Sequence, residues 1–151
     1  NFYLFNIAIS NFEGDIEFYL DEHSSKSSLV KINTNNFYYK FKSFLLGSKN
    51  KSPELIKVNC NSLDQIFENE NLTRVIIKID TNGNELNTLE GMKKTLSNCD
   101  FLIIEFHKLN AYSNYDPTLI ESFLKENNFK LIKTFKFPFT NWEDRIYSKI
   151  N

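Results

Sequence analysis

The segment that most constrains the fold is residues 75–85, Val-Ile-Ile-Lys-Ile-Asp-Thr-Asn-Gly-Asn-Glu. Its first five residues are almost continuously apolar, which is typical of a parallel strand buried on both faces. Asp80 follows this strand directly, and Asn82-Gly83 then makes a turn before a helical pattern begins. Because ligand sites in α/β proteins lie just beyond the carboxyl ends of the strands, we predict that Asp80 lies at a functional site.

Patterns along the rest of the chain predict an α/β fold. Strands are expected at 2–9, 16–20, 29–32, 55–58, 75–79, 101–106, 129–135 and 145–150, and helices after Ser62, at 85–97 and after Asp116. Ser62 and Gln65 have the spacing of a capping box, and Asp116-Pro117 is a typical helix start. The turn cluster at 11–15 predicts an N-terminal β-hairpin, and the later alternation of strands and helices predicts a mostly parallel sheet with helical crossovers.

Size and composition narrow the possible functions. With 151 residues, the chain is expected to form a single domain, residues 1–151. Its net charge of -1 gives no electrostatic basis for binding nucleic acid or an anionic membrane, and no apolar stretch approaches the roughly 20 residues that span a bilayer. Cys60 and Cys99 lack the paired spacing of a zinc or thiol redox site, so no metal site is predicted and a reduced, cytoplasmic setting is expected.

Several segments resemble the FkbM-type methyltransferases, which transfer a methyl group from S-adenosylmethionine to hydroxyls, often on sugars or natural products. Residues 78–85 match the family pattern Lys-Ile-Asp-Val-Glu-Gly-x-Glu. Residues 89–91 match the Leu-x-Gly of the family's next helix, and 103–107 match a strand that ends in Glu. Residues 6–14 resemble the family's Ala-x-Ser and Gly segment, and 58–64 its Val-x-x-x-Ser/Thr-Leu-Asp segment. The resemblance implies a partial Rossmann-like class I methyltransferase fold with an antiparallel last strand.

Two departures from the family pattern affect the expected site. Asn82 replaces the first glutamate of the Asp-x-Glu-Gly motif. The family binds its cofactor through a Gly-rich turn after strand one and an acid after strand two, but the glycines of this chain form no such cluster. We therefore expect the chain to be the C-terminal portion of a longer methyltransferase domain. Without strands one and two, the strand 75–79 would have an unpaired apolar edge through which the chain could self-associate.

Charged residues near the ends of two predicted strands are the candidate catalytic residues. If these strands are adjacent, we expect Lys78 beside Glu105 and Asp80 beside His107. Lys78 and Glu105 could form an ion pair that satisfies two half-buried charges, or Glu105 could belong to the acceptor site. Methylation of a hydroxyl needs a base, and an imidazole titrates close to neutral pH, so His107, oriented by Asp80, is the candidate base. The alternative is that His107 is a loop or packing residue.

The resemblance suggests further contacts with cofactor and acceptor. Ala8 and Ile9 lie where this fold places backbone near the adenine, although they could instead be core residues. Asp80 is also a candidate for cofactor binding. Glu85 and Asn82 are candidates for binding the acceptor, although Glu85 could instead cap the first turn of its own helix. The aromatic and basic stretch 37–46 could be an acceptor-binding lid or an irregular, partly buried loop.

The leading interpretation is an S-adenosylmethionine-dependent O-methyltransferase that acts on a hydroxyl of a sugar, a glycan or a natural product. Asp80, Glu105 and His107 would be its catalytic residues. One alternative is a non-catalytic module of the same fold that binds a glycan or a protein partner. Another is a different α/β enzyme with the same strand order. Cofactor binding would separate the first two interpretations.

Overall fold

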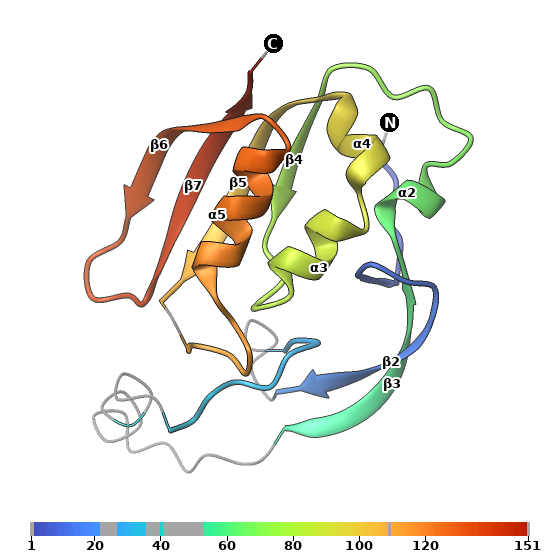
Figure 1. Cartoon of the computed structure of the whole chain (residues 1–151). Coiled ribbons are helices and arrows are strands. Elements are labelled where there is room, and N and C mark those ends of the chain that lie inside the picture. The colour runs from blue at the N-terminus through green and yellow to red at the C-terminus, as the bar shows by residue number, and fades with distance from the viewer. Residues whose placement is uncertain (1, 22–26, 36–39, 41–52, 109, 151) are drawn as a thin grey trace.

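The computed structural model describes residues 2–21, 27–35, 40, 53–108 and 110–150. These residues form two sheets and a group of short helices (Figure 1). The elements are, in chain order, β1 (Ala8–Ile9), β2 (Gly14–Leu20), β3 (Glu54–Asn61), α2 (Leu63–Ile66), β4 (Val75–Ile79), α3 (Glu85–Glu90), α4 (Lys93–Ser97), β5 (Cys99–His107), α5 (Pro117–Glu126), β6 (Phe129–Lys136) and β7 (Trp142–Lys149). The predicted lid at 37–46 lies outside the described residues except for Lys40.

The strands pair in a mixed arrangement. The smaller sheet has the order β1-β3-β2, in which β1 pairs with β3 parallel and β2 pairs with β3 antiparallel. The larger sheet has the order β4-β5-β7-β6, with a parallel β4–β5 pair and antiparallel β5–β7 and β6–β7 pairs. The α/β class and the antiparallel last strand are confirmed. A mostly parallel sheet is not confirmed, because β7 runs opposite to both of its neighbours.

The predicted N-terminal β-hairpin is wrong. β2 pairs along its whole length with β3, and β3 separates β2 from β1. The predicted strand at 29–32 is reduced to one isolated bridge, in which Ile32 lies opposite Tyr112 and joins this segment to the loop after β5. The turn residues at 11–15 indicate that the chain reverses direction. They do not indicate that a later strand, β3, lies between the two strands that the turn connects.

The main core lies between the larger sheet and the helices α3, α4 and α5, of which α5 crosses in front of that sheet in Figure 1. Alternate residues of β5 point into this core, and Leu102, Ile104 and Phe106 are fully buried there. The intervening positions, including Glu105 and His107, therefore lie on the opposite face of the sheet. The alternation thus separates the packing residues of β5 from its candidate catalytic residues.

The predicted helix at 85–97 is two short helices that meet at Gly91 and Met92. Gly91 packs directly against the end of β1, since a Cβ at this position would lie 2.0 Å from the Ser10 carbonyl oxygen. The second helix has its own cap from a distant residue. The Asp64 carboxylate accepts hydrogen bonds from the backbone N–H groups of Lys94 at 2.9 Å and Thr95 at 2.8 Å. The helices on both sides of the break are therefore held by distant residues: the end of α3 packs against the end of β1, and Asp64 caps α4.

The start of α5 carries the side-chain cap that its sequence predicts. The Asp116 carboxylate accepts hydrogen bonds from the Thr118 backbone N–H at 2.9 Å and from the Thr118 hydroxyl at 2.7 Å, and Pro117 follows the cap. We expect Asp116→Ala to lower the free energy of unfolding by about 1 kcal/mol, measured by urea denaturation. Asp116→Asn keeps an acceptor oxygen and should retain most of that stability. An alanine variant as stable as the wild type would contradict this role.

One edge of the larger sheet is open among the described residues. β4 is its first strand, and Ile76 on that strand is 66% exposed. Self-association through this edge stays a prediction. None of the helices in the described ranges is both long and apolar enough to cross a membrane.

Candidate active site

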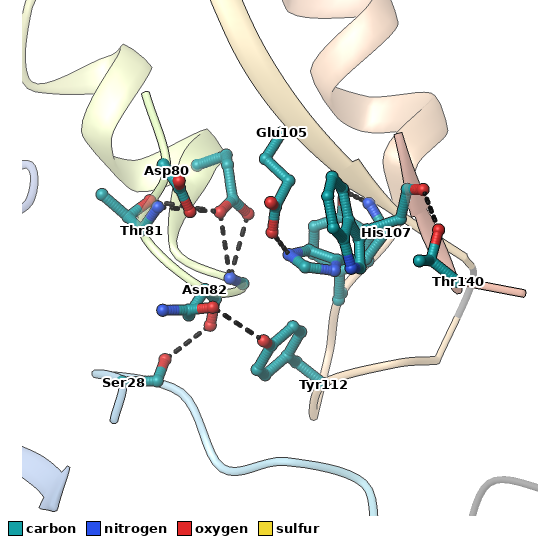
Figure 2. Close-up of polar contacts among 12 residues, drawn as sticks. Ser28, Asp80, Thr81, Asn82, Glu105, His107, Tyr112 and Thr140 are labelled. Carbon is teal, nitrogen blue, oxygen red and sulfur yellow. Dashed lines mark hydrogen bonds and ion pairs between the residues drawn. The ribbon is translucent and has the colours of Figure 1, made fainter. Parts of the chain in front are cut away.

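The loop between β4 and α3 is closed by a buried carboxylate. Glu85 is fully buried, and its Oε1 accepts hydrogen bonds from the backbone N–H groups of Thr81 at 3.2 Å and Gly83 at 3.0 Å (Figure 2). Burial raises the pKa of Glu85, while the charge of His107 and these N–H groups act in the opposite direction. Glu85 therefore holds the loop that follows Asp80. Its role in binding an acceptor stays a prediction.

Asn82 connects this loop to two distant segments (Figure 2). Its backbone carbonyl accepts a hydrogen bond from the Ser28 hydroxyl at 2.5 Å, and its Oδ1 accepts one from the Tyr112 hydroxyl at 3.2 Å. Its side-chain amide donates to the Ser27 carbonyl at 3.3 Å, a bond that a glutamate could not donate. With φ of 51°, Asn82 occupies the left-handed region, where Asn is better tolerated than most residues. Asparagine thus suits this position of the loop.

His107 lies at the end of β5 beside a carboxylate of the same strand. Glu105 Oε1 is 3.0 Å from His107 Nε2, and only 5% of the His107 side chain is exposed (Figure 2). No aligned hydrogen bond joins the two atoms, so the pair is a close polar contact. The rings of Tyr112 and Tyr115 flank the imidazole, with centroids at 4.8 Å and 5.6 Å. His107 is therefore held firmly in a largely enclosed position.

The predicted cross-strand charge pairs between β4 and β5 are wrong. The register places Lys78 opposite Ile103 rather than Glu105, two residues short of the predicted partner. Lys78 instead pairs with Asp80, with Nζ 2.6 Å from Oδ2 and both side chains about half exposed. Burial lowers the pKa of Lys78, but the pairing with Asp80 outweighs it, so that the pKa is raised. Each strand therefore pairs its own charges.

Comparison with known proteins places these features in a family. The profile of the methyltransferase FkbM domain matches residues 2–131. The chain belongs to the FkbM methyltransferase family. The matched range contains the Asp80 loop and the Glu105–His107 pair, and it ends within β6. No curated protein and no solved structure matches the chain.

FkbM methyltransferases typically use S-adenosylmethionine, and two of the residues predicted to contact it can be located in the structure. Asp80 is half exposed at the end of β4, and Ala8 is partly exposed in β1, where the resemblance places the cofactor. The glycines near these residues face the protein instead. A Cβ at Gly83 would meet the Tyr112 ring, and a Cβ at Gly91 would meet the end of β1. The described residues thus form no glycine cradle for a cofactor, and the cofactor contacts of Asp80 and Ala8 stay predictions.

Two residues of β7, Trp142 and Asp144, were not predicted to lie at the site, but they lie beside His107 and Glu105 of β5. Trp142 is the cross-strand neighbour of His107, and Asp144 is that of Glu105. Burial raises the pKa of Asp144, Lys78 lowers it, and the neighbouring carboxylates raise it further. One signal pointed to this strand, because Trp142 is the single tryptophan of the chain and follows a turn. The antiparallel return of β7 beside β5 was needed to place it.

Proposed function

We propose that the chain carries the acceptor side of an S-adenosylmethionine-dependent O-methyltransferase that methylates a hydroxyl of a sugar, a glycan or a natural product. The observation that carries this proposal is the enclosed His107–Glu105 pair at the end of β5, which could supply a base. Membership of the FkbM family supports methyl transfer as the reaction class.

His107 is the base in this proposal. When bound, S-adenosylmethionine would supply the methyl group, and its sulfur would keep the electron pair of the S–CH3 bond. The acceptor oxygen forms the new C–O bond, and its proton goes to the imidazole nitrogen that does not face Glu105. The nearby carboxylate stabilises the imidazolium that results, since an opposite charge favours the protonated form. Glu105 is thus a positioning and charge-stabilising residue.

The Asp80 loop has a different part in this proposal. Lys78 holds the Asp80 carboxylate at the end of β4, where it can orient a hydroxyl of the acceptor or the cofactor. Glu85 and Asn82 keep the loop in place through the contacts in Figure 2. The reaction then depends mainly on the alignment of the acceptor oxygen, with His107 removing its proton.

The test is His107→Asn in the protein that carries this chain. We expect the rate of methyl transfer to fall about 10²- to 10⁴-fold, the usual contribution of a general base. Binding of S-adenosylmethionine, measured by calorimetry, should be unchanged. Glu105→Gln serves as a second variant in case the asparagine variant does not fold, and a smaller loss of kcat is expected from it. Turnover at the wild-type rate in a folded His107→Asn protein would remove His107 from the mechanism.

One observation favours a second candidate, a non-catalytic module that binds a glycan or a protein partner. Asn82 stands where the FkbM pattern has a glutamate, and its side chain is committed to Ser27 and Tyr112. Calorimetric titration with S-adenosylmethionine distinguishes the two candidates. Saturable binding supports the methyltransferase, whereas glycan binding without cofactor binding supports the module.

A further inference from the structure

Tyr112 in the loop after β5 contacts both halves of the proposed site (Figure 2). Its hydroxyl donates a hydrogen bond to Asn82 Oδ1 at 3.2 Å, and its ring meets the His107 imidazole at an interplanar angle of 72°, with centroids 4.8 Å apart. The backbone pairing of β4 with β5 ends at Ile79 and Ile104, before Asn82 and His107 are reached. Tyr112 therefore connects the ends of the two strands where their own pairing has stopped.

The Tyr112 ring packs directly on the backbone of the loop after β4. A Cβ at Gly83 would lie 2.5 Å from Tyr112 Cγ and 2.8 Å from its Cδ2, so a glycine here leaves room for the ring. Gly83 has φ of 98°, a conformation that glycine adopts readily, and its N–H donates to Glu85 Oε1 at 3.0 Å. Because the ring and the loop backbone are in contact, a displacement of the ring would displace the loop that carries Asp80.

The backbone of Tyr112 is held by the segment 31–33. Tyr112 forms an antiparallel bridge with Ile32. Two backbone hydrogen bonds flank this bridge, from the Asn33 N–H to the Ala111 carbonyl at 3.1 Å and from the Ser113 N–H to the Lys31 carbonyl at 2.8 Å. The Tyr115 ring packs against Tyr112, with centroids 6.2 Å apart, and Tyr112 is only 7% exposed. Contacts within the protein therefore fix the place of this side chain.

We propose that Tyr112 is a positioning residue for methyl transfer, which sets the separation between the Asp80 loop and His107. In-line transfer needs the acceptor oxygen aligned with the methyl group and within reach of the base, and a displacement of about 1 Å can lower the rate about 10²-fold. The Tyr112 hydroxyl is bound to Asn82, so its part is to hold the loop and not to move a proton. The role in catalysis rests on the proposed function, whereas the connection between the loop and His107 does not.

Kinetics of variants in the protein that carries this chain test the role in catalysis. We expect Tyr112→Leu to lower kcat about 10²-fold and to change the KM for S-adenosylmethionine less than about threefold, since alignment is lost rather than binding. Tyr112→Phe keeps the ring and should restore most of kcat. Tyr147→Leu is the matched control, because Tyr147 is also a buried tyrosine, 4% exposed, but packs in the main core. It should leave kcat unchanged.

NMR tests the connection without methyl transfer. The chain has two histidines, His23 and His107, so His107→Asn assigns the ring-proton signals of His107. Asn82→Gly removes the amide that binds Tyr112 and suits the φ of 51° at this position. We expect this change to shift the His107 signals when Tyr112 is present and to leave them in place in the Tyr112→Leu protein, as coupling through Tyr112 requires.

The outcomes separate this inference from the proposed function. A wild-type kcat in Tyr112→Leu, or an equal fall of kcat in Tyr147→Leu, would overturn the positioning role. Equal shifts of the His107 signals by Asn82→Gly with and without Tyr112 would overturn the connection. Shifts that depend on Tyr112 in a protein without methyltransferase activity would support the connection and count against the proposed reaction.

Discussion

Gly91→Ala is expected to lower the free energy of unfolding by about 3 kcal/mol, the upper range for overpacking a core. The new methyl carbon would lie 2.0 Å from the Ser10 carbonyl oxygen and 2.9 Å from the Asn11 Cα. Both are backbone atoms, so no side-chain rotation can relieve the clash. The backbone of Gly91 has φ of -81°, which alanine adopts without strain. The loss would therefore come from the close contact between the end of α3 and the end of β1.

Urea denaturation followed by circular dichroism measures this loss. Asn98→Ala is the matched control, because Asn98 also follows a short helix, has φ of -103° and is exposed. It should change the free energy of unfolding by less than about 0.5 kcal/mol, as surface substitutions usually do. If Gly91→Ala and Asn98→Ala unfolded at the same urea concentration as the wild type, the contact between α3 and β1 would have no energetic importance.

Gly91 also shows how far a motif can be understood from sequence. The Leu-x-Gly pattern pointed to the family, and its leucine, Leu89, is buried in the core. The reason for the glycine was not predictable, because Ser10 is distant in the sequence and meets Gly91 only through tertiary packing. Local patterns report which face of an element is buried, but they do not report which backbone lies against it.

The charged residues of the site show the same limit. Asp80 could be placed at a strand end, because the apolar run before it defines β4 and its direction. Its partner could not be predicted, since the sequence of neither strand shows how far β4 is displaced along β5, and Asp80 pairs with Lys78 of its own strand. The position of His107 at the end of β5 followed from the pattern, but its neighbour Trp142 required the order in which β7 enters the sheet.

The second large effect is expected at Glu85, which connects packing to the site. Glu85→Ala should lower the free energy of unfolding by about 3 kcal/mol, because the N–H groups of Thr81 and Gly83 lose their shared acceptor in a largely enclosed loop. The loop carries Asp80 and Asn82, so the rate of methyl transfer should also fall when the loop loses this acceptor. Urea denaturation and an activity assay on the same sample measure both effects. A stable, fully active alanine variant would contradict the structural role.

Glu85→Gln provides the control and adds a pH dependence. Its amide oxygen can still accept from the loop N–H groups, so the loss of stability should be smaller than that of Glu85→Ala.

Burial raises the pKa of Glu85 in the folded state, so the folded protein binds this proton more tightly than the unfolded chain does. The resulting stabilisation is fully present at pH values below the ordinary pKa of glutamate, and it is lost as the pH rises through the raised pKa of the folded state. The wild type should therefore lose stability relative to Glu85→Gln over that rise, and urea denaturation at a series of pH values measures the difference. Parallel pH profiles for the two proteins would show that the Glu85 carboxyl titrates alike in the folded and unfolded states.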